Sequence, residues 1–304
     1  MSARLPVQAA AIIEDAAVPV EHLPAYIREL EEAMTADAVE AVIYAHASAG
    51  CLHVRPFLDL RQPQQVAAME RIARASARLA RKYGGVIASE HGDGRARGAL
   101  AQDFYTPALY AAYQATKRAF DPAGRLNPGK IVDVPPLTEA LRMGPDYRPS
   151  AVASGLAFFD AKGRDIGFVE AVEACNGSAV CRKTEVGTMC PPFMATREEK
   201  DSTRGRANAL REALSGGLDA LTAPEVGEAL GLCVSCKACK AECPASVDMA
   251  ALKAVWQAKK WETETPSART RLFAHLPVVA KRVAGPLARV ANAVNRLPPA
   301  RATL

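Results

Sequence analysis

The chain has 304 residues, enough for two ordinary domains that each bury a core. Hydrophobic residues make up 49% and charged residues 23%, which is typical of a globular protein and excludes a disordered or fibrous one. The net charge of +5 is too small to indicate a nucleic-acid-binding protein. No apolar run reaches the ~20 residues of a membrane span, and the N-terminus lacks an export signal, so we expect a cytoplasmic protein.

Residues 1–132 alternate β-like and helical segments, which predicts an α+β domain with an antiparallel or mixed sheet. Alternating or β-rich runs predict strands over residues 10–19, 38–48, 51–60 and 85–89. Helical periodicity predicts helices over residues 22–34, 63–84 and 107–121. We expect the second of these helices to end at Gly84 and Gly85.

The remaining chain divides into three predicted segments. Residues 133–172 are rich in proline and glycine and read as a connector. Residues 173–262 are predicted to be helical, with cysteine-bearing loops and clear helices over 198–217 and 247–260. Residues 263–304 read as a basic helical tail, either packed on a further C-terminal region or lying on a membrane surface as a peripheral helix.

Seven of the eight cysteines lie between Cys175 and Cys243. In a chain without a secretion signal, such a cluster indicates metal ligands rather than disulfides. Cys233, Cys236, Cys239 and Cys243 follow the C-x2-C-x2-C-x3-C-P pattern, in which three thiolates bind one [4Fe–4S] cluster and the fourth ligates another. Zinc is the alternative, but zinc sites usually use paired C-x2-C knuckles.

A second cluster needs cysteines upstream of this motif. Cys190 precedes a proline, as Cys243 does, and is therefore the expected fourth ligand of the cluster held by the motif's first three cysteines. Cys243 would then join Cys175 and Cys181, with Ser178 where a fourth cysteine would stand. Three thiolates suit a [3Fe–4S] cluster, or a [4Fe–4S] cluster with one oxygen ligand. The alternative is that the two upstream cysteines are unrelated thiols.

Histidines and a carboxylate cluster in the first domain. His46 and His53 flank a turn of small residues, and Glu90 and His91 follow in the stretch SEHGDG. Two imidazoles and a carboxylate suit a divalent metal such as zinc, with a position open for Lewis-acid chemistry. His91, beside the carboxylate, could act as a general base. Separated histidines are also often ordinary polar residues, and the residues alone leave both interpretations open.

The stretch FDPAGRLNPGK carries Asn127 and Lys130 beside glycine and proline. It is either a reverse turn after a helix or a cofactor contact, and the residues do not choose between them.

Taken in order, HASAGCLHVRP, SEHGDG and FDPAGRLNPGK resemble the C-terminal cap domain of FAD-linked oxidases, a family that includes D-lactate dehydrogenase, the glycolate oxidase flavin subunit and D-2-hydroxyglutarate dehydrogenase. The cysteine loops that follow are similar to the ferredoxin-type module of bacterial flavin and iron–sulfur 2-hydroxy-acid dehydrogenases. The resemblance implies a ferredoxin-like cap of the vanillyl-alcohol-oxidase type, followed by an α-helical dicluster ferredoxin domain.

The resemblance also implies roles for individual residues. His46, His53 and Glu90 match the family's metal ligands, and His91 matches the histidine that takes the substrate's hydroxyl proton. The substrate would be a D-2-hydroxy acid, oxidised by FAD, with electrons passing through the two clusters to a downstream acceptor. Asn127 and Lys130 fall in the family's turn near the flavin.

Two departures from the family follow. The commoner loop reads HxGDGNLH, whereas this chain has Cys51 in place of the asparagine. Arg55 lies two residues past His53 on the same strand face, so we expect it to bind the substrate carboxylate.

The second departure is that the family's FAD-binding domain is missing from the chain. We therefore expect a piece of a larger enzyme or one product of a split gene, inactive and without FAD when isolated. The alternative is a non-catalytic electron-transfer subunit that docks on a separate flavoprotein.

Overall fold

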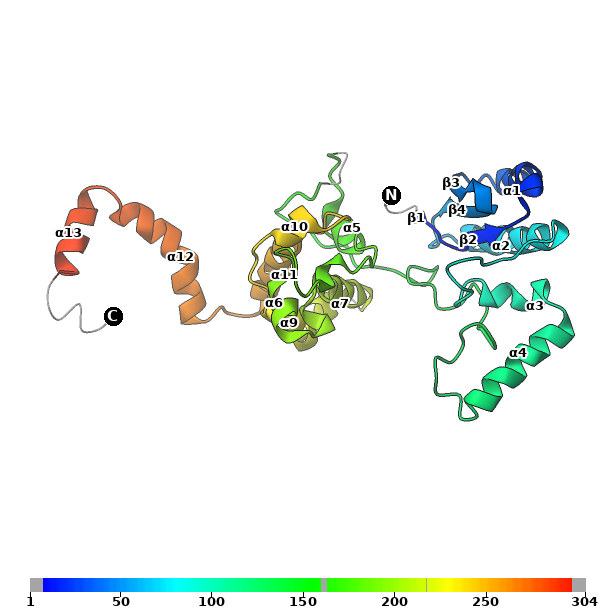
Figure 1. Cartoon of the computed structure of the whole chain (residues 1–304). Helices are drawn as coiled ribbons and strands as arrows, with labels where there is room; N and C mark the ends of the chain where they lie inside the picture. Colours follow the sequence, from blue (N-terminus) through cyan, green and yellow to red (C-terminus); the bar gives the residue numbers. More distant parts are fainter. Residues whose placement is uncertain (1–7, 160–162, 217, 297–304) are drawn as a thin grey trace.

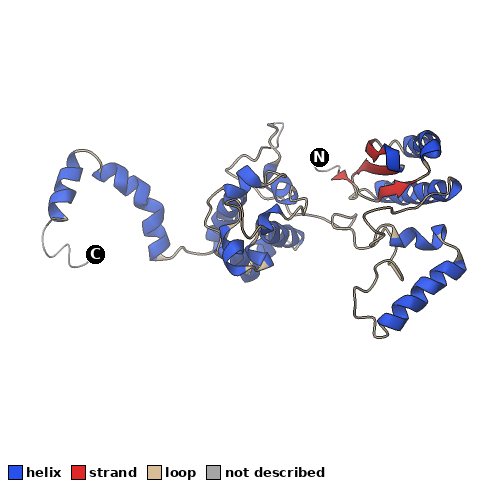
Figure 2. Ribbon diagram, viewed as in Figure 1, coloured by secondary structure: helices blue, strands red, loops and turns tan. Residues whose placement is uncertain are grey.

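The computed structural model describes residues 8–159, 163–216 and 218–296 (Figure 1). Residues 1–7 of the predicted first domain and 297–304 of the predicted tail lie outside this part. Among the described residues, strands occur only near the N-terminus, and helices and loops form the rest (Figure 2). A small sheet with several helices confirms the mixed α and β character of the first domain.

Strand β4 (Cys51–Leu58) is the centre of the sheet. It pairs antiparallel with β1 (Gln8–Ala9), β2 (Ile13–Ala17) and β3 (Ala41–His46). All the pairings between these strands are therefore antiparallel, which is one of the two sheet types expected from the sequence.

Helices α1 (Leu23–Ala36) and α2 (Pro63–Lys82) pack against each other and the sheet (Figure 1). Tyr26 and Ile72 are buried between them, because apolar residues recur at helical spacing on one face of each helix. The chain leaves α2 through Gly84 at φ +67°, a left-handed conformation that glycine adopts without strain. The predicted end of this helix is confirmed.

The strand predicted over residues 85–89 is wrong. Only one antiparallel bridge forms, between Ala17 and Val86. The next residues leave the sheet because the Asp15 carboxylate accepts from the backbone N–H groups of Glu90 and His91, while the Ser89 N–H is shared between this carboxylate and the Asp15 carbonyl of β2.

Short helices complete the N-terminal part, and a longer one leads away from it. They are η1 (Val20–His22), η2 (Ala47–Ala49), η3 (Gly98–Leu100), α3 (Ala101–Phe104) and α4 (Pro107–Phe120). Thr106 caps α4 by accepting a hydrogen bond from the Leu109 N–H, and Asp121 closes it.

Seven of the eight cysteines lie in a body of short helices with its own core, and the eighth, Cys51, is on β4. These helices are α5 (Gly167–Glu173), η4 (Val180–Arg182), α6 (Pro191–Thr196), η5 (Glu199–Asp201), α7 (Thr203–Ser215), α8 (Leu218–Leu221), α9 (Pro224–Gly231), α10 (Ala238–Glu242) and α11 (Met249–Thr263). Leu210, Leu214 and Leu252 are fully buried in this core, where the Trp256 indole N–H donates to the Leu221 carbonyl at 2.8 Å.

Helices α12 (Ala268–Val283) and α13 (Pro286–Val294) extend beyond this body (Figure 1). No residue of α12 is buried, and Leu272 and Phe273 are exposed. Within the part of the chain that the structure describes, none of the helices has the length and apolar character needed to cross a bilayer.

Candidate functional site

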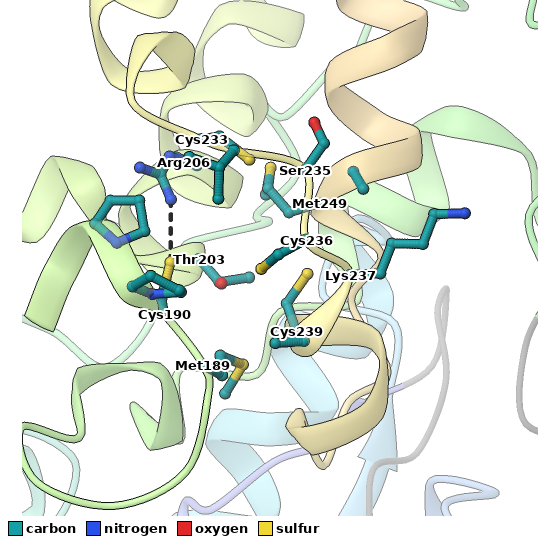
Figure 3. Close-up of a pocket in the computed structure, with 15 residues that line it drawn as sticks. Met189, Cys190, Thr203, Arg206, Cys233, Ser235, Cys236, Lys237, Cys239 and Met249 are labelled. Atoms are coloured by element: carbon teal, nitrogen blue, oxygen red, sulfur yellow. Dashed lines mark hydrogen bonds between the residues drawn. The ribbon is translucent and has the colours of Figure 1, made fainter.

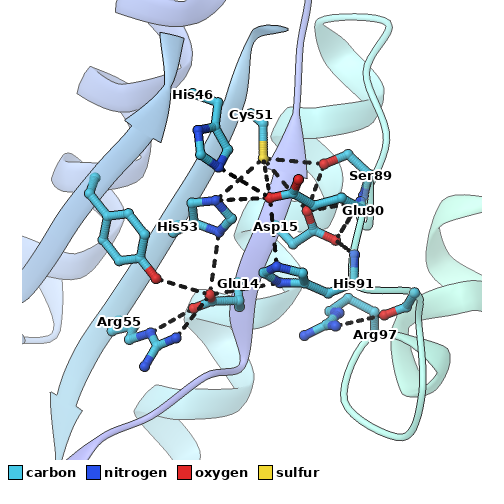
Figure 4. Close-up of polar contacts among 12 residues, drawn as sticks. Glu14, Asp15, His46, Cys51, His53, Arg55, Ser89, Glu90, His91 and Arg97 are labelled. Atoms are coloured by element: carbon cyan, nitrogen blue, oxygen red, sulfur yellow. Dashed lines mark hydrogen bonds and ion pairs between the residues drawn. The ribbon is translucent and has the colours of Figure 1, made fainter. Parts of the chain in front are cut away.

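The sheet gathers a polar site at one end of β4 (Figure 4). His53 on β4 lies opposite Glu14 of β2 and Tyr44 of β3, which makes a row of three side chains across the strands. A β-bulge follows Glu14, and Asp15 within it has φ +80°. Because the bulge breaks the strand's alternation, both neighbouring carboxylates reach the site.

Glu90 is the point on which the histidines converge. Its Oε1 atom lies 3.5 Å from His46 Nε2, 3.2 Å from His53 Nε2 and 3.6 Å from His91 Nε2. The His53 side chain is only 2% exposed, whereas those of His46 and His91 are 61% and 46% exposed. The structure thus brings together the histidines and the carboxylate singled out in the sequence, with one face of the group open.

Asp15 holds the loop that carries Glu90. Its carboxylate accepts hydrogen bonds from the backbone N–H groups of Ser89, Glu90 and His91 and from the Ser89 hydroxyl, at 2.6–3.0 Å. Burial alone would raise the pKa of Asp15, but these hydrogen bonds outweigh it and hold the pKa at about 2. A charged carboxylate therefore fixes the loop at neutral pH.

Glu14 lies behind His53 and is almost fully buried. Its carboxylate accepts hydrogen bonds from Arg55 Nε at 2.8 Å and Nη2 at 3.0 Å, and Tyr44 donates at 3.3 Å. Burial works against its charge, but the Arg55 hydrogen bond and charge lower the pKa of Glu14 overall. His53 Nδ1 lies 3.3 Å from Glu14 Oε1 without a hydrogen bond between them, and His53 Nε2 faces Glu90 as the candidate ligand atom.

Arg55, predicted to bind substrate, thus has a partner within the protein in Glu14. Its side chain is still 37% exposed, so part of the guanidinium faces outward.

Cys51 lies beneath the same group. Its sulfur accepts from the Ser89 hydroxyl at 3.3 Å and is 3.7 Å from His53 Nε2 and 3.8 Å from Glu90 Oε1. Burial raises the pKa of the Cys51 thiol, so the thiol is neutral in the absence of a cation. One oxygen, nitrogen or sulfur atom from each of Asp15, Cys51, His53 and Glu90 lies within 4.8 Å of the others, a spacing that suits a metal ion.

Asn127 and Lys130 are exposed on the turn after α4. Asp121 shapes this turn by accepting from the backbone N–H groups of Arg125 and Leu126, both at 2.9 Å. The turn ends at Ile131, whose N–H donates to the Gly94 carbonyl at 2.9 Å. The turn is therefore joined to the loop after His91, but no contact recorded in the structure links Asn127 or Lys130 to the histidines.

A first cavity lies among the cysteine loops (Figure 3). Its lining includes the first three cysteines of the C-x2-C-x2-C motif and, from a distant part of the chain, the cysteine before Pro191: Cys233, Cys236, Cys239 and Cys190. The sequence predicted these four thiols as one ligand set.

A second cavity is lined by Cys175, Cys181 and Cys243, together with Ser178. This is the other predicted set, with the serine in the position noted in the sequence. Thr203, the first residue of α7, lines both cavities and therefore lies between them.

Two arginines donate hydrogen bonds to cysteine sulfurs. The Arg204 N–H donates to Cys181 Sγ at 3.3 Å, and Arg206 Nη1 donates to Cys190 Sγ at 3.3 Å. Burial raises the pKa of Cys181 and of Cys239. All eight cysteines lie among the described residues and none is in a disulfide, so each thiol is free to bind metal. Four thiols around one cavity, and three thiols with a hydroxyl around the other, fit iron–sulfur clusters.

Glu242 ties the two cysteine loops together. Its carboxylate accepts from the Thr188 N–H at 2.7 Å and from Lys183 Nζ at 2.9 Å. Thr188 lies two residues before Cys190, and Glu242 comes directly before Cys243. Hydrogen bonds from Thr188, and then from Lys183, lower the pKa of Glu242 to about 2.

Comparisons with known proteins agree with this division. Residues 1–131 match the family described as FAD linked oxidases, C-terminal domain. Residues 174–248 match the 4Fe-4S dicluster domain. The chain joins an FAD-linked oxidase C-terminal domain to a 4Fe–4S dicluster domain. The family resemblance drawn from the sequence is thereby confirmed.

The relatives of this two-domain chain are longer proteins. It is 32% identical over 277 residues to a D-2-hydroxyglutarate dehydrogenase of Pseudomonas putida and 31% identical over 279 residues to that of Escherichia coli. Each match covers 78% of this chain and 26% of the relative. A glycolate oxidase subunit of Bacillus subtilis is 31% identical over 123 residues, covering 40% of this chain and 26% of that protein. The chain thus spans about a quarter of the length of these curated relatives.

Sequence reasoning missed three residues of these sites. Glu14 and Asp15 had a signal, because two adjacent acidic residues interrupt an otherwise apolar strand. Arg206 had none, because a single arginine in a predicted helix does not differ from a surface residue.

Proposed function

We propose that this chain forms the substrate-binding and electron-transfer part of a flavin-dependent dehydrogenase of D-2-hydroxy acids, of the D-2-hydroxyglutarate, D-lactate or glycolate type. The observation that carries the proposal is the convergence of three imidazoles on Glu90, in the same chain as two cavities lined by cysteines. The names of the curated relatives support the same class of substrate.

His46, His53 and Glu90 would hold a divalent metal such as zinc. FAD would be held mostly by a domain outside these 304 residues, with Asn127 and Lys130 of the oxidase C-terminal domain facing it. When bound, the metal supplies a Lewis acid and the flavin supplies a two-electron acceptor.

The chain's own residues have distinct tasks in this proposal. His91 accepts the substrate's hydroxyl proton, since its ring is 46% exposed and stacks on the buried His53 with centroids 5.2 Å apart. Arg55 keeps two nitrogens on Glu14 and would meet the substrate carboxylate with its outward edge. Glu14 orients His53, and Asp15 fixes the loop of Glu90 and His91.

The dicluster domain would carry electrons away one at a time. Cys190, Cys233, Cys236 and Cys239 would hold a [4Fe–4S] cluster. Cys175, Cys181 and Cys243 would hold the second cluster, as [3Fe–4S] or as [4Fe–4S] with an oxygen ligand.

The alternative function is an electron-transfer subunit whose first domain only docks on a flavoprotein. Such a domain has no need of a metal site.

Metal binding by the full chain separates the two functions. We expect about one zinc ion bound per chain in addition to iron, and tighter zinc binding when D-2-hydroxyglutarate, D-lactate or glycolate is added as a probe. His53→Ala should weaken zinc binding by more than roughly tenfold. His275→Ala is the matched control, because His275 is exposed on α12. If the chain bound no zinc, or if His53→Ala bound zinc as tightly as the unmodified chain, the enzyme function would be rejected in favour of the docking function.

A further inference from the structure

One buried cation lies on the wall of the first cysteine cavity and belongs to none of the ligand sets. Arg206, in the first turn of α7, has no exposed surface. Its Nη1 donates to Cys190 Sγ at 3.3 Å, a contact drawn in Figure 3. Its Nε donates to the Ala229 carbonyl at 2.8 Å, which fixes the plane of the guanidinium. The side chain is therefore held with one edge toward the thiols.

The charge of Arg206 is incompletely balanced by the protein. The nearest carboxylate is that of Asp201, whose Oδ1 lies 3.7 Å from Arg206 Nη2. Among the described residues, Arg206 Nη2 and Asp201 Oδ1 both lack a hydrogen-bond partner. A buried guanidinium with loose pairing is costly unless something anionic lies beside it. The cavity of four thiols is the neighbour that can supply negative charge.

The second cavity shows a different arrangement. Arg204 lines it but gives only its backbone N–H to Cys181 Sγ. Its guanidinium points to Glu199, with hydrogen bonds of 2.7 Å and 2.9 Å, and the side chain is 24% exposed. The arginines of the two cavities are thus neighbours in sequence but differ in burial and pairing.

We propose that Arg206 raises the reduction potential of the cluster at Cys190, Cys233, Cys236 and Cys239, relative to the same cluster without this cation. The proposal rests on the proposed function, because it requires that cluster to be present. A cubane with four thiolates carries net negative charge and gains one more negative charge on one-electron reduction. No bond or proton changes in this step. A buried cation that donates to a ligand sulfur stabilises the reduced form more than the oxidised form.

Asp201 should act in the opposite direction. Its carboxylate is 1% exposed, accepts a hydrogen bond from the Thr196 hydroxyl at 2.8 Å and partly offsets Arg206. Removing that negative charge leaves the cation stronger, so the cluster becomes easier to reduce. The two residues therefore predict shifts of opposite sign, which general damage to the cavity would not produce.

The test is a dithionite redox titration of the full, anaerobically reconstituted chain, followed by EPR, which reports the two clusters separately. At the midpoint of the unmodified cluster, Arg206→Gln should lower the ratio of reduced to oxidised cluster at least tenfold, which is 59 mV for a one-electron couple. Asp201→Asn should raise this ratio. Arg206→Lys, which keeps the charge and loses the forked geometry, should fall between Arg206→Gln and the unmodified chain.

The cluster at Cys175, Cys181 and Cys243 is the internal control, and its midpoint should move much less in every variant. Equal shifts of both clusters, no shift in Arg206→Gln, or shifts of the same sign in Arg206→Gln and Asp201→Asn would overturn the proposal. If the Arg206→Gln chain does not assemble its clusters, the direction of the potential shift in Asp201→Asn tests the proposal, and a downward shift would overturn it. An unmodified chain without a cluster at Cys190 would instead reject the proposed function.

Discussion

The two sites are held in different ways. In the oxidase C-terminal domain, two carboxylates hold the site through several hydrogen bonds: Asp15 accepts from three consecutive residues, and Glu14 is bonded to Arg55 and Tyr44, although the buried His53 Nδ1 has no hydrogen-bond partner among the described residues. In the dicluster domain, burial raises the pKa of Cys181 and Cys239, and Arg206 retains a nitrogen without a partner.

This contrast indicates where each site gets its geometry. The histidine site is arranged by the protein itself, through a bulged strand and a loop fixed by one carboxylate. The cysteine cavities are lined by loops whose main interactions would be with their clusters. The first site should therefore survive loss of its metal, and the second should loosen without iron.

Iron removal should have the largest effect. Anaerobic chelation should expose the loops over residues 175–190 and 232–243, and their amide hydrogen exchange should become at least about a hundredfold faster. Strand β4 and helix α2 serve as the control and should keep their protection. Equal loss of protection in both domains would contradict the contrast.

Asp15→Asn should have the next largest effect. An amide cannot accept every hydrogen bond that the carboxylate accepts, so we expect about 2–4 kcal/mol less stability in the first domain. Zinc affinity should fall roughly 10–100-fold, because the loop of Glu90 is released. Urea unfolding and zinc titration measure the two effects.

Asp59→Asn is the matched control for that variant. Asp59 pairs with Arg61 at 3.0 Å near the surface, and its loss should cost about 1 kcal/mol or less. If Asp15→Asn behaved like this control, the loop would be held by something other than Asp15.

Glu242→Gln should have a moderate effect on the dicluster domain. The neutral side chain loses the ion pair with Lys183 and weakens the hold on Thr188, so the chain before Cys190 becomes more mobile. Iron release to a chelator should become severalfold faster, as followed by absorbance. Glu228→Gln, which removes a surface pair with Lys200, should leave the rate unchanged. Equal rates in both variants would mean that the clusters alone hold the loops.

Asp121→Asn should have the smallest effect and a defined pH dependence. Hydrogen bonds from Lys117, and then from the backbone of Leu126 and Arg125, lower the pKa of Asp121 to about 2 from an ordinary 3.8. The stabilisation is therefore complete above the ordinary pKa and is lost as pH falls through the folded value. The variant should show a flatter decline in stability from about pH 4 to pH 2 than the unmodified chain. Asp146→Asn, at an exposed site, should keep the original decline.

The sequence predicted the parts of these sites that follow spacing rules. Helix α2 follows apolar periodicity and ends at a left-handed glycine, and the C-x2-C-x2-C motif predicts which thiols share a cavity. These features depend on local geometry, so residues near in sequence determine them.

The features missed depend on contacts between distant segments. The strand over 85–89 is reduced to the Ala17–Val86 bridge because the side chain of Asp15, about 70 residues earlier, accepts from the N–H groups of Glu90 and His91 and turns the chain out of the sheet. Arg55 has strand spacing that aims it at the site, but the sequence does not reveal that Glu14 reaches it through a bulge. Arg206 becomes special only because α7 and the chain at Cys190 fold together.

EPR of single-cysteine variants tests the central claim, which is that each cluster takes one ligand from the other loop. Cys243→Ala should remove or alter the signal of the cluster at Cys175 and Cys181 and leave the cluster at Cys233, Cys236 and Cys239 intact, although Cys243 belongs to the latter's motif. Cys190→Ala should remove or alter the signal of the cluster at Cys233, Cys236 and Cys239 and leave the cluster at Cys175 and Cys181 intact. If Cys243→Ala instead removed the cluster of its own motif and spared the other, the account would be contradicted.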